Sequence, residues 1–217
     1  KLAMFRDKLD LPFKTGLFLS ALINISKEDD YTIHVANYPQ APNRIGHRNC
    51  KNITVHGDIG NDAGDHMEYG ILRINGNVGD RLGSNMKYGM IELNGNADVD
   101  AGYHMEYGRI VINGNAGKDI GARMHDGIII LNGDTTIVGT SMNGGVLRIN
   151  GKYEEVASNA HYGTIYHKRR RVFHKIRKSE PEPIPSYIIE PRVERYAEMF
   201  EEAEFRSKGK IIWSGSK

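Results

Sequence analysis

The residues of this chain best suited to chemistry are two histidines and a serine, His66, Ser84 and His104. They follow one another at intervals of about 19 residues, a spacing that brings side chains together when repeated units stack. A serine hydroxyl activated by a neighbouring imidazole can attack an ester carbonyl. The His66/Ser84/His104 edge is therefore a candidate hydrolase site, although Ser84 does not lie in a Gly-x-Ser-x-Gly turn.

The same histidines are candidate metal ligands. If the units stack as β-strands do, His66 and His104 are two strands and roughly 9 to 10 Å apart. One ion cannot bridge that distance, because its nitrogen ligands lie at about 2.1 Å. Asp65 and His125 fall near the same surface without completing a ligand set. The sequence thus assigns no metal, cofactor-binding or catalytic residue to this chain.

Basic residues gather nearer the C-terminus. Arg169, Arg170 and Arg171 open a basic run that extends to Lys178. Such a run can bind nucleic acid through phosphate contacts. The following segment, 180–204, is rich in glutamate, and the whole chain carries 29 Lys and Arg against 27 Asp and Glu. Neutralisation by these carboxylates or by a partner subunit is the preferred interpretation, and nucleic-acid binding is the alternative.

A repeat in the middle of the chain must position these side chains. Glycines recur about every 19 residues in three columns, a period that indicates stacked supersecondary units. The columns are Gly57, Gly76, Gly95, Gly114 and Gly133; Gly64, Gly83, Gly102, Gly121 and Gly139; and Gly70, Gly89, Gly108, Gly127 and Gly145. Three glycines in every unit disfavour a helix.

Strands are expected where apolar residues alternate, just before the first glycine column. The apolar pairs are Ile53/Val55, Leu72/Ile74, Ile91/Leu93, Ile110/Ile112, Ile129/Leu131 and Leu147/Ile149. Side chains two apart on a strand share a face, so each pair points into one core. The predicted fold is all-β, a single-stranded parallel β-helix of about six coils. We expect residues 1–44 to form an N-terminal cap, 45–168 the β-helix, and 169–217 a basic strand, a Pro-rich joint and an acidic α-helical arm.

Three further columns describe how the coils would contact one another. They are an asparagine column, Asn75, Asn94, Asn113, Asn132 and Asn150; a methionine column, Met67, Met86, Met105, Met124 and Met142; and a tyrosine column, Tyr69, Tyr88 and Tyr107. Asparagine tolerates a left-handed backbone, and stacked amides can form a hydrogen-bonded ladder. Methionine is adaptable core filler. The tyrosines are either rigid packing or an exposed interaction strip.

The composition indicates the expected environment. A single cysteine, Cys50, excludes an internal disulfide and any multi-cysteine metal site. A reducing compartment is therefore expected, and the chain is predicted to be cytoplasmic. No apolar stretch reaches the roughly 18 to 20 residues that span a bilayer. The net charge of +2 predicts no polyanionic partner.

The repeated phrase resembles a known domain family. Its clearest copy is Asn113-Gly114-Asn115-Ala116-Gly117 followed by Gly121-Ala122-Arg123-Met124-His125-Asp126-Gly127, and sister copies extend over residues 53 to 165. This text resembles the GXGXG domain, which forms the C-terminal part of the glutamate synthase large subunit and also one of the subunits of formylmethanofuran dehydrogenase. The resemblance implies a right-handed β-helix with a structural role. It carries over no catalytic residue, because the flavin, iron–sulfur, molybdopterin or amidotransferase chemistry of those complexes lies in other domains or subunits.

These observations predict a non-catalytic scaffold subunit of a redox complex related to glutamate synthase or formylmethanofuran dehydrogenase, with no cofactor in this chain. The expected partners are catalytic subunits, a second copy of the chain, or both. Two alternatives stay open. One is a stand-alone hydrolase at the His66/Ser84/His104 edge, and the other is a nucleic-acid binder that uses Arg169 to Lys178.

Overall fold

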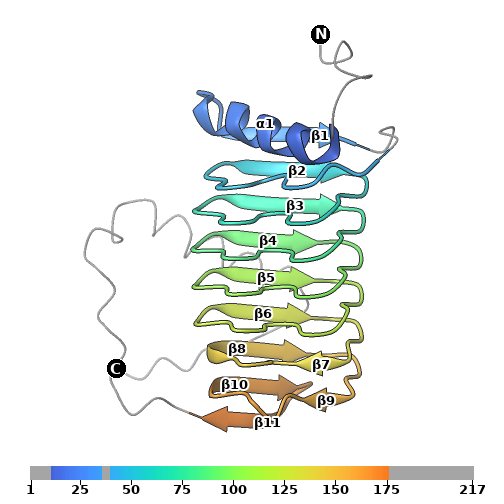
Figure 1. Ribbon diagram of the computed structural model, residues 1–217, viewed down its shortest axis with the longest axis vertical. Coiled ribbons are helices and arrows are strands. Elements are labelled where there is room, and N and C mark those ends of the chain that lie inside the picture. Colours follow the sequence, from blue (N-terminus) through green and yellow to red (C-terminus); the bar gives the residue numbers. More distant parts are fainter. Residues whose placement is uncertain (1–10, 36–39, 176–217) are drawn as a thin grey trace, which may run out of the picture. The chain divides into compact units, whose positions relative to one another are not determined.

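The computed structural model describes residues 11–35 and 40–175, which form a parallel β-solenoid of about seven turns (Figure 1). One nine-stranded sheet runs through it. Its strands are β1 (Asp30–His34), β2 (Asn52–His56), β3 (Ile71–Asn75), β4 (Met90–Leu93), β5 (Arg109–Ile112), β6 (Ile128–Leu131), β8 (Asn143–Ile149), β10 (Tyr162–His167) and β11 (Arg170–Lys175). The predicted parallel β-helix is confirmed, with about seven turns rather than about six.

The strands stack in register through the repeat. The first four residues of β3 lie opposite the residues 19 positions later in β4, as Leu72 does with Ile91, and this offset continues through β6. All six apolar pairs predicted for the core are buried, with exposed fractions of 0 or 1%. The five column methionines are fully buried as well. A second, two-stranded sheet pairs β7 (Ile137–Val138) with β9 (Glu155–Val156).

Two glycine columns satisfy different requirements. Gly83 has φ +64°, a left-handed conformation that a residue with a Cβ adopts only with strain. Gly95 has no such φ, but a Cβ there would lie 2.0 Å from the carbonyl oxygen of Gly76 in the preceding coil. One column therefore allows the chain to turn, and the other allows successive coils to approach closely.

Helix α1 (Leu11–Ile25) covers the first coil and is an element that the sequence analysis did not predict (Figure 1). Polar side chains bind it to the backbone of that coil. The Gly46 amide donates to Ser20 Oγ at 2.9 Å, and Asn24 Nδ2 donates to the Arg48 carbonyl oxygen at 3.1 Å. These bonds satisfy polar groups at the end of the stack, where no preceding coil can pair with them.

The other end of the sheet reverses direction. The chain turns at Lys168, which has φ 55°, and β11 pairs antiparallel with β10. Arg169, Arg170 and Arg171 are exposed at this reversal. The sheet thus begins before residue 45 and continues past residue 168, on both sides of the predicted β-helix boundaries. Lys175 is exposed at the end of β11, whereas Arg177, Lys178 and the predicted α-helical arm lie outside the described residues. No helix of the described part is long and apolar enough to cross a membrane.

Candidate functional site

One corner of each coil carries a residue in the left-handed conformation. This corner column consists of Arg48, His66, Asn85, His104, Arg123 and Ser141, with φ between 50° and 55°. Backbone hydrogen bonds link the corners of successive coils, as in the bond from the His66 amide to the Ser84 carbonyl oxygen at 2.8 Å. His66 and His104 therefore lie in one column with Asn85 between them, as predicted.

Ser84 does not form a nucleophile–base pair with either histidine. Its side chain is buried, and its hydroxyl accepts a hydrogen bond from Asn85 Nδ2 at 2.9 Å. Within the described residues, no histidine ring hydrogen-bonds to this hydroxyl. The geometry thus gives no support to a hydrolase at the His66/Ser84/His104 edge, since a serine nucleophile needs an adjacent base.

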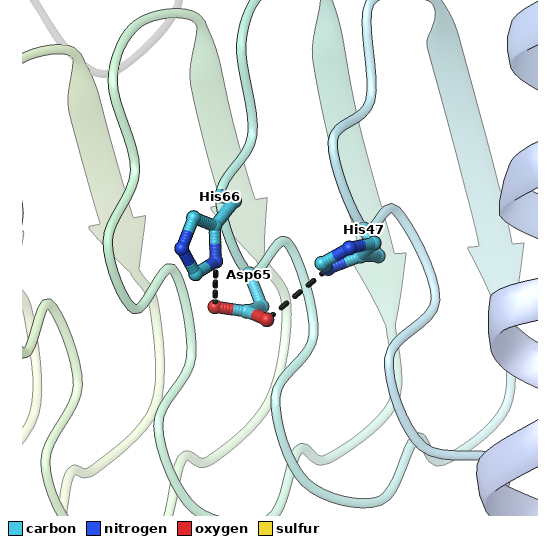
Figure 2. Close-up of side chains that lie close together, drawn as sticks. All are labelled: His47, Asp65 and His66. Atoms are coloured by element: carbon cyan, nitrogen blue, oxygen red, sulfur yellow. Dashed lines mark hydrogen bonds and ion pairs between the residues drawn. The ribbon is translucent and has the colours of Figure 1, made fainter.

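His66 instead meets Asp65 and a residue from the preceding coil, His47 (Figure 2). Asp65 Oδ1 lies 2.7 Å from His66 Nδ1, and Asp65 Oδ2 lies 3.1 Å from His47 Nδ1. One metal-binding atom from each of the three side chains lies within 4.8 Å of the others. We call this group the His–Asp–His cluster. The sequence analysis placed Asp65 near this surface but did not include His47, which the structure brings to the same carboxylate.

The alignment of the repeats explains why His47 was missed. His47 lies 18 residues before Asp65, and the two residues differ in type, so no repeated residue marks this position in the sequence. A signal was present in the sequence, since Gly46 precedes His47 just as Gly64 precedes Asp65. Both glycines have positive φ, at 80° and 69°, so they occupy the same position of successive coils.

The cluster surrounds a buried carboxylate. The side chain of Asp65 is 5% exposed, against 23% for His47 and 41% for His66. Arg44 Nη1 lies 3.4 Å from Asp65 Oδ2, and Asn85 Nδ2 donates to Asp65 Oδ1 at 3.3 Å. Burial lowers the pKa of His47 despite the opposing effect of Asp65, so neutral imidazole is favoured there.

Two imidazoles and a carboxylate have two chemical uses in this arrangement. They can join two coils through hydrogen bonds to the shared carboxylate, as they do here. They can also bind a divalent transition metal, because imidazole nitrogen and carboxylate oxygen are ligands of Zn²⁺ and related ions.

The asparagine column forms the predicted amide ladder. Each Nδ2 donates to the Oδ1 one coil earlier, at 2.9 Å from Asn94 to Asn75 and at 2.7 Å for the three following pairs up to Asn150. The left-handed backbone considered for these asparagines is not observed, since the residues with positive φ lie elsewhere in the coil.

A second ladder was not predicted. The Asn96 amide donates to Asn77 Oδ1 at 3.0 Å, and the Asn115 amide donates to Asn96 Oδ1 at 2.8 Å. The repeated Asn-Gly-Asn text, with one asparagine for each ladder, was the signal for it.

The tyrosine column is a stack of rings along the solenoid. The ring centroids of Tyr69 and Tyr88 are 5.7 Å apart, and those of Tyr88 and Tyr107 are 5.4 Å apart, with planes within 9° of parallel. Tyr107 is 42% exposed, while the other two are half-buried. The rings therefore pack on one another and still reach the surface.

Most of the notable side chains thus contact their own counterparts in neighbouring coils, and the His–Asp–His cluster departs from this pattern. The chain matches no protein-family model and no curated protein, so its relation to the GXGXG domain rests on the repeated phrase alone.

Proposed function

We propose that the chain is a non-catalytic scaffold subunit of a redox complex related to glutamate synthase or formylmethanofuran dehydrogenase. The repeated phrase that resembles the GXGXG domain supports this proposal. The ladders support it too, because the asparagine and methionine columns are used to hold one coil on the next. A stack of this kind is a rigid body on which other subunits can be arranged.

An exposed apolar stripe on α1 is the observation that carries the docking role. Phe18, Leu22 and Ile25 are 54%, 43% and 80% exposed. Their spacing places them on one face of the helix, and the opposite face is buried on the first coil through Ser20 and Ile23. Large apolar side chains grouped on a surface commonly mark a binding site for another protein.

The proposed occupant of this stripe is a catalytic subunit that receives α1 in an apolar groove. Helix-in-groove binding uses anchor residues at this spacing. A catalytic subunit is chosen over a second copy because the resemblance places the redox chemistry of such complexes outside the GXGXG domain.

The test is affinity purification of the tagged chain from its native cells under gentle conditions. We expect flavin-, iron–sulfur- or molybdenum-containing subunits to be recovered with the wild-type chain and to be lost from a Phe18→Gln/Leu22→Gln variant. Lys87→Gln, at an exposed position of the solenoid away from this helix, is the control and should retain them. Recovery of the chain alone, or only of further copies of it, would count against the proposal.

A further inference from the structure

We propose that His47, Asp65 and His66 bind one divalent transition-metal ion of the Zn²⁺ class at the corner between two successive coils. This inference does not depend on the scaffold function. It starts from the convergence of two imidazole nitrogens on the two oxygens of one buried carboxylate (Figure 2).

The distances lie close to those of a metal site. Ligand bonds of about 2.0 to 2.1 Å in a tetrahedral site place neighbouring ligand atoms about 3.3 Å apart. The two Nδ1 atoms now lie 2.7 and 3.1 Å from Asp65 oxygens, and one metal-binding atom from each side chain lies within 4.8 Å of the others. The ion would take the place of the Nδ1 protons, and each neutral imidazole would then carry its proton on Nε2.

The backbone holds the ligands in place before any ion binds. The Asp65 carbonyl oxygen accepts from the Arg48 amide at 3.0 Å, and the His66 amide donates to the Ser84 carbonyl oxygen at 2.8 Å. Both bonds join neighbouring coils, so the ligands belong to the rigid stack. A site on rigid elements loses little conformational entropy when it binds.

The cluster also leaves a position open. His66 is 41% exposed on the solvent side, whereas Asp65 is almost fully buried. Three protein ligands and a water molecule are the usual set of an accessible zinc site. The proposed ion would therefore be open to solvent or to a small ligand.

Arg44 is the cation that opposes binding. Its Nη1 lies 3.4 Å from Asp65 Oδ2, but its Nε also lies 3.5 Å from Asp62 Oδ2. Arg44 can therefore keep a carboxylate partner in Asp62 when an ion occupies the Asp65 side. Removing the Arg44 charge should strengthen metal binding, because like charges repel at this distance.

The ligand types select among metals. Imidazole with a single carboxylate suits Zn²⁺, Ni²⁺, Co²⁺ and Cu²⁺. Mg²⁺ and Ca²⁺ prefer ligand sets made of oxygen. We therefore expect Zn²⁺ and Co²⁺ to bind the chain and Mg²⁺ not to compete with them.

The experiment titrates ZnCl₂ into the full chain, freed of metal by a chelator, and measures binding by calorimetry. CoCl₂ provides a second readout, because the visible absorption of Co²⁺ reports its ligands. We expect one equivalent to bind, and His66→Asn to weaken binding by about tenfold or more. His104→Asn is the matched control, since it changes the same corner two coils away and should leave binding unchanged. Asn85 shows that this corner accepts asparagine.

A second variant is expected to bind Zn²⁺ more tightly, a result that loss of folding cannot produce. Arg44→Asn, at a position with φ 58° that asparagine tolerates, should bind Zn²⁺ more tightly than the wild type. Failure of the folded wild-type chain to bind Zn²⁺ would overturn the proposal. So would equal weakening by His66→Asn and His104→Asn, or an Arg44→Asn variant that binds no more tightly.

Discussion

His66 and His104 occupy the same corner of the solenoid two coils apart, and their surroundings differ. Their φ angles are 54° and 53°, and each backbone amide donates to a carbonyl oxygen of the next coil. His66 contacts the carboxylate of Asp65. His104 packs edge-on against Tyr103, with ring centroids 4.5 Å apart, and its pKa is lowered by burial and then by Arg123.

The difference arises from one neighbouring column. The position held by Asp65 is held by Ser84, Tyr103 and Ala122 in the next three coils, so the carboxylate is present beside only one of the two histidines. The repeat thus fixes the backbone position of each corner residue. The side chains beside that residue, in its own coil and in the adjacent coils, determine its chemical environment. Three changes test this distinction.

Met86→Ala should cause the largest loss of unfolding free energy, because it removes a core side chain from the coil between the two corners. Met86 is fully buried in the coil between those of His66 and His104. Truncation of a buried methionine costs about 2 to 5 kcal/mol of unfolding free energy. Urea denaturation measures the loss, and hydrogen exchange at the His66 and His104 amides should accelerate together. Lys87→Ala, the exposed neighbour, should change stability by no more than about 0.5 kcal/mol. Acceleration at one corner alone would show that the coils open separately.

Asp65→Ala should affect the corner of His66 and leave the corner of His104 unchanged. The change removes the carboxylate that His47 and His66 share, and the expected loss of stability is about 1 to 3 kcal/mol. Ser84→Ala, one coil later in the same column, removes a single hydrogen bond from Asn85 and should cost about 1 kcal/mol or less. Both losses are measured by urea denaturation, together with the chemical shifts of the His104 ring, which should not move. Equal losses in the two variants would mean that the cluster adds nothing to stability.

Asp100→Asn should have the smallest effect and the opposite sign. Burial, followed by the charges of Asp119 and Asp80, raises the pKa of Asp100 in the coil of His104. The folded state is therefore penalised while Asp100 is ionised, and this penalty is relieved as the pH falls through the raised pKa. The variant should be more stable than the wild type at neutral pH by at most about 0.5 kcal/mol. Thermal unfolding at several pH values should show the gain shrinking as the medium becomes acidic, and a gain that grows in acid would contradict this explanation.

The features that recur in every coil could be predicted from the sequence. The apolar pairs, the methionine column and the amide ladder recur every 18 or 19 residues with the same or similar residue types, so periodicity alone placed them. It did not place His47, because the equivalent residues in the next coils are Asp65 and Ser84, and no residue type repeats at this position. Helix α1 was missed for a related reason: Phe18, Leu22 and Ile25 are apolar but exposed, so apolar residues lie on both of its faces and obscure the helical period.

The unbroken register from β2 to β6 has a consequence for how such a chain can change length. Within that stretch each strand meets the next at an offset of 19 residues in the sequence. A gene that gained or lost one whole repeat there would still encode a stack with every column complete and with both of its ends intact. A change of another length has to be accommodated within one coil, as in the 18-residue step from Asn132 to Asn150. The middle of this molecule can therefore be lengthened by whole 19-residue repeats. The first coil has a different interval, so it cannot be exchanged for one of these repeats.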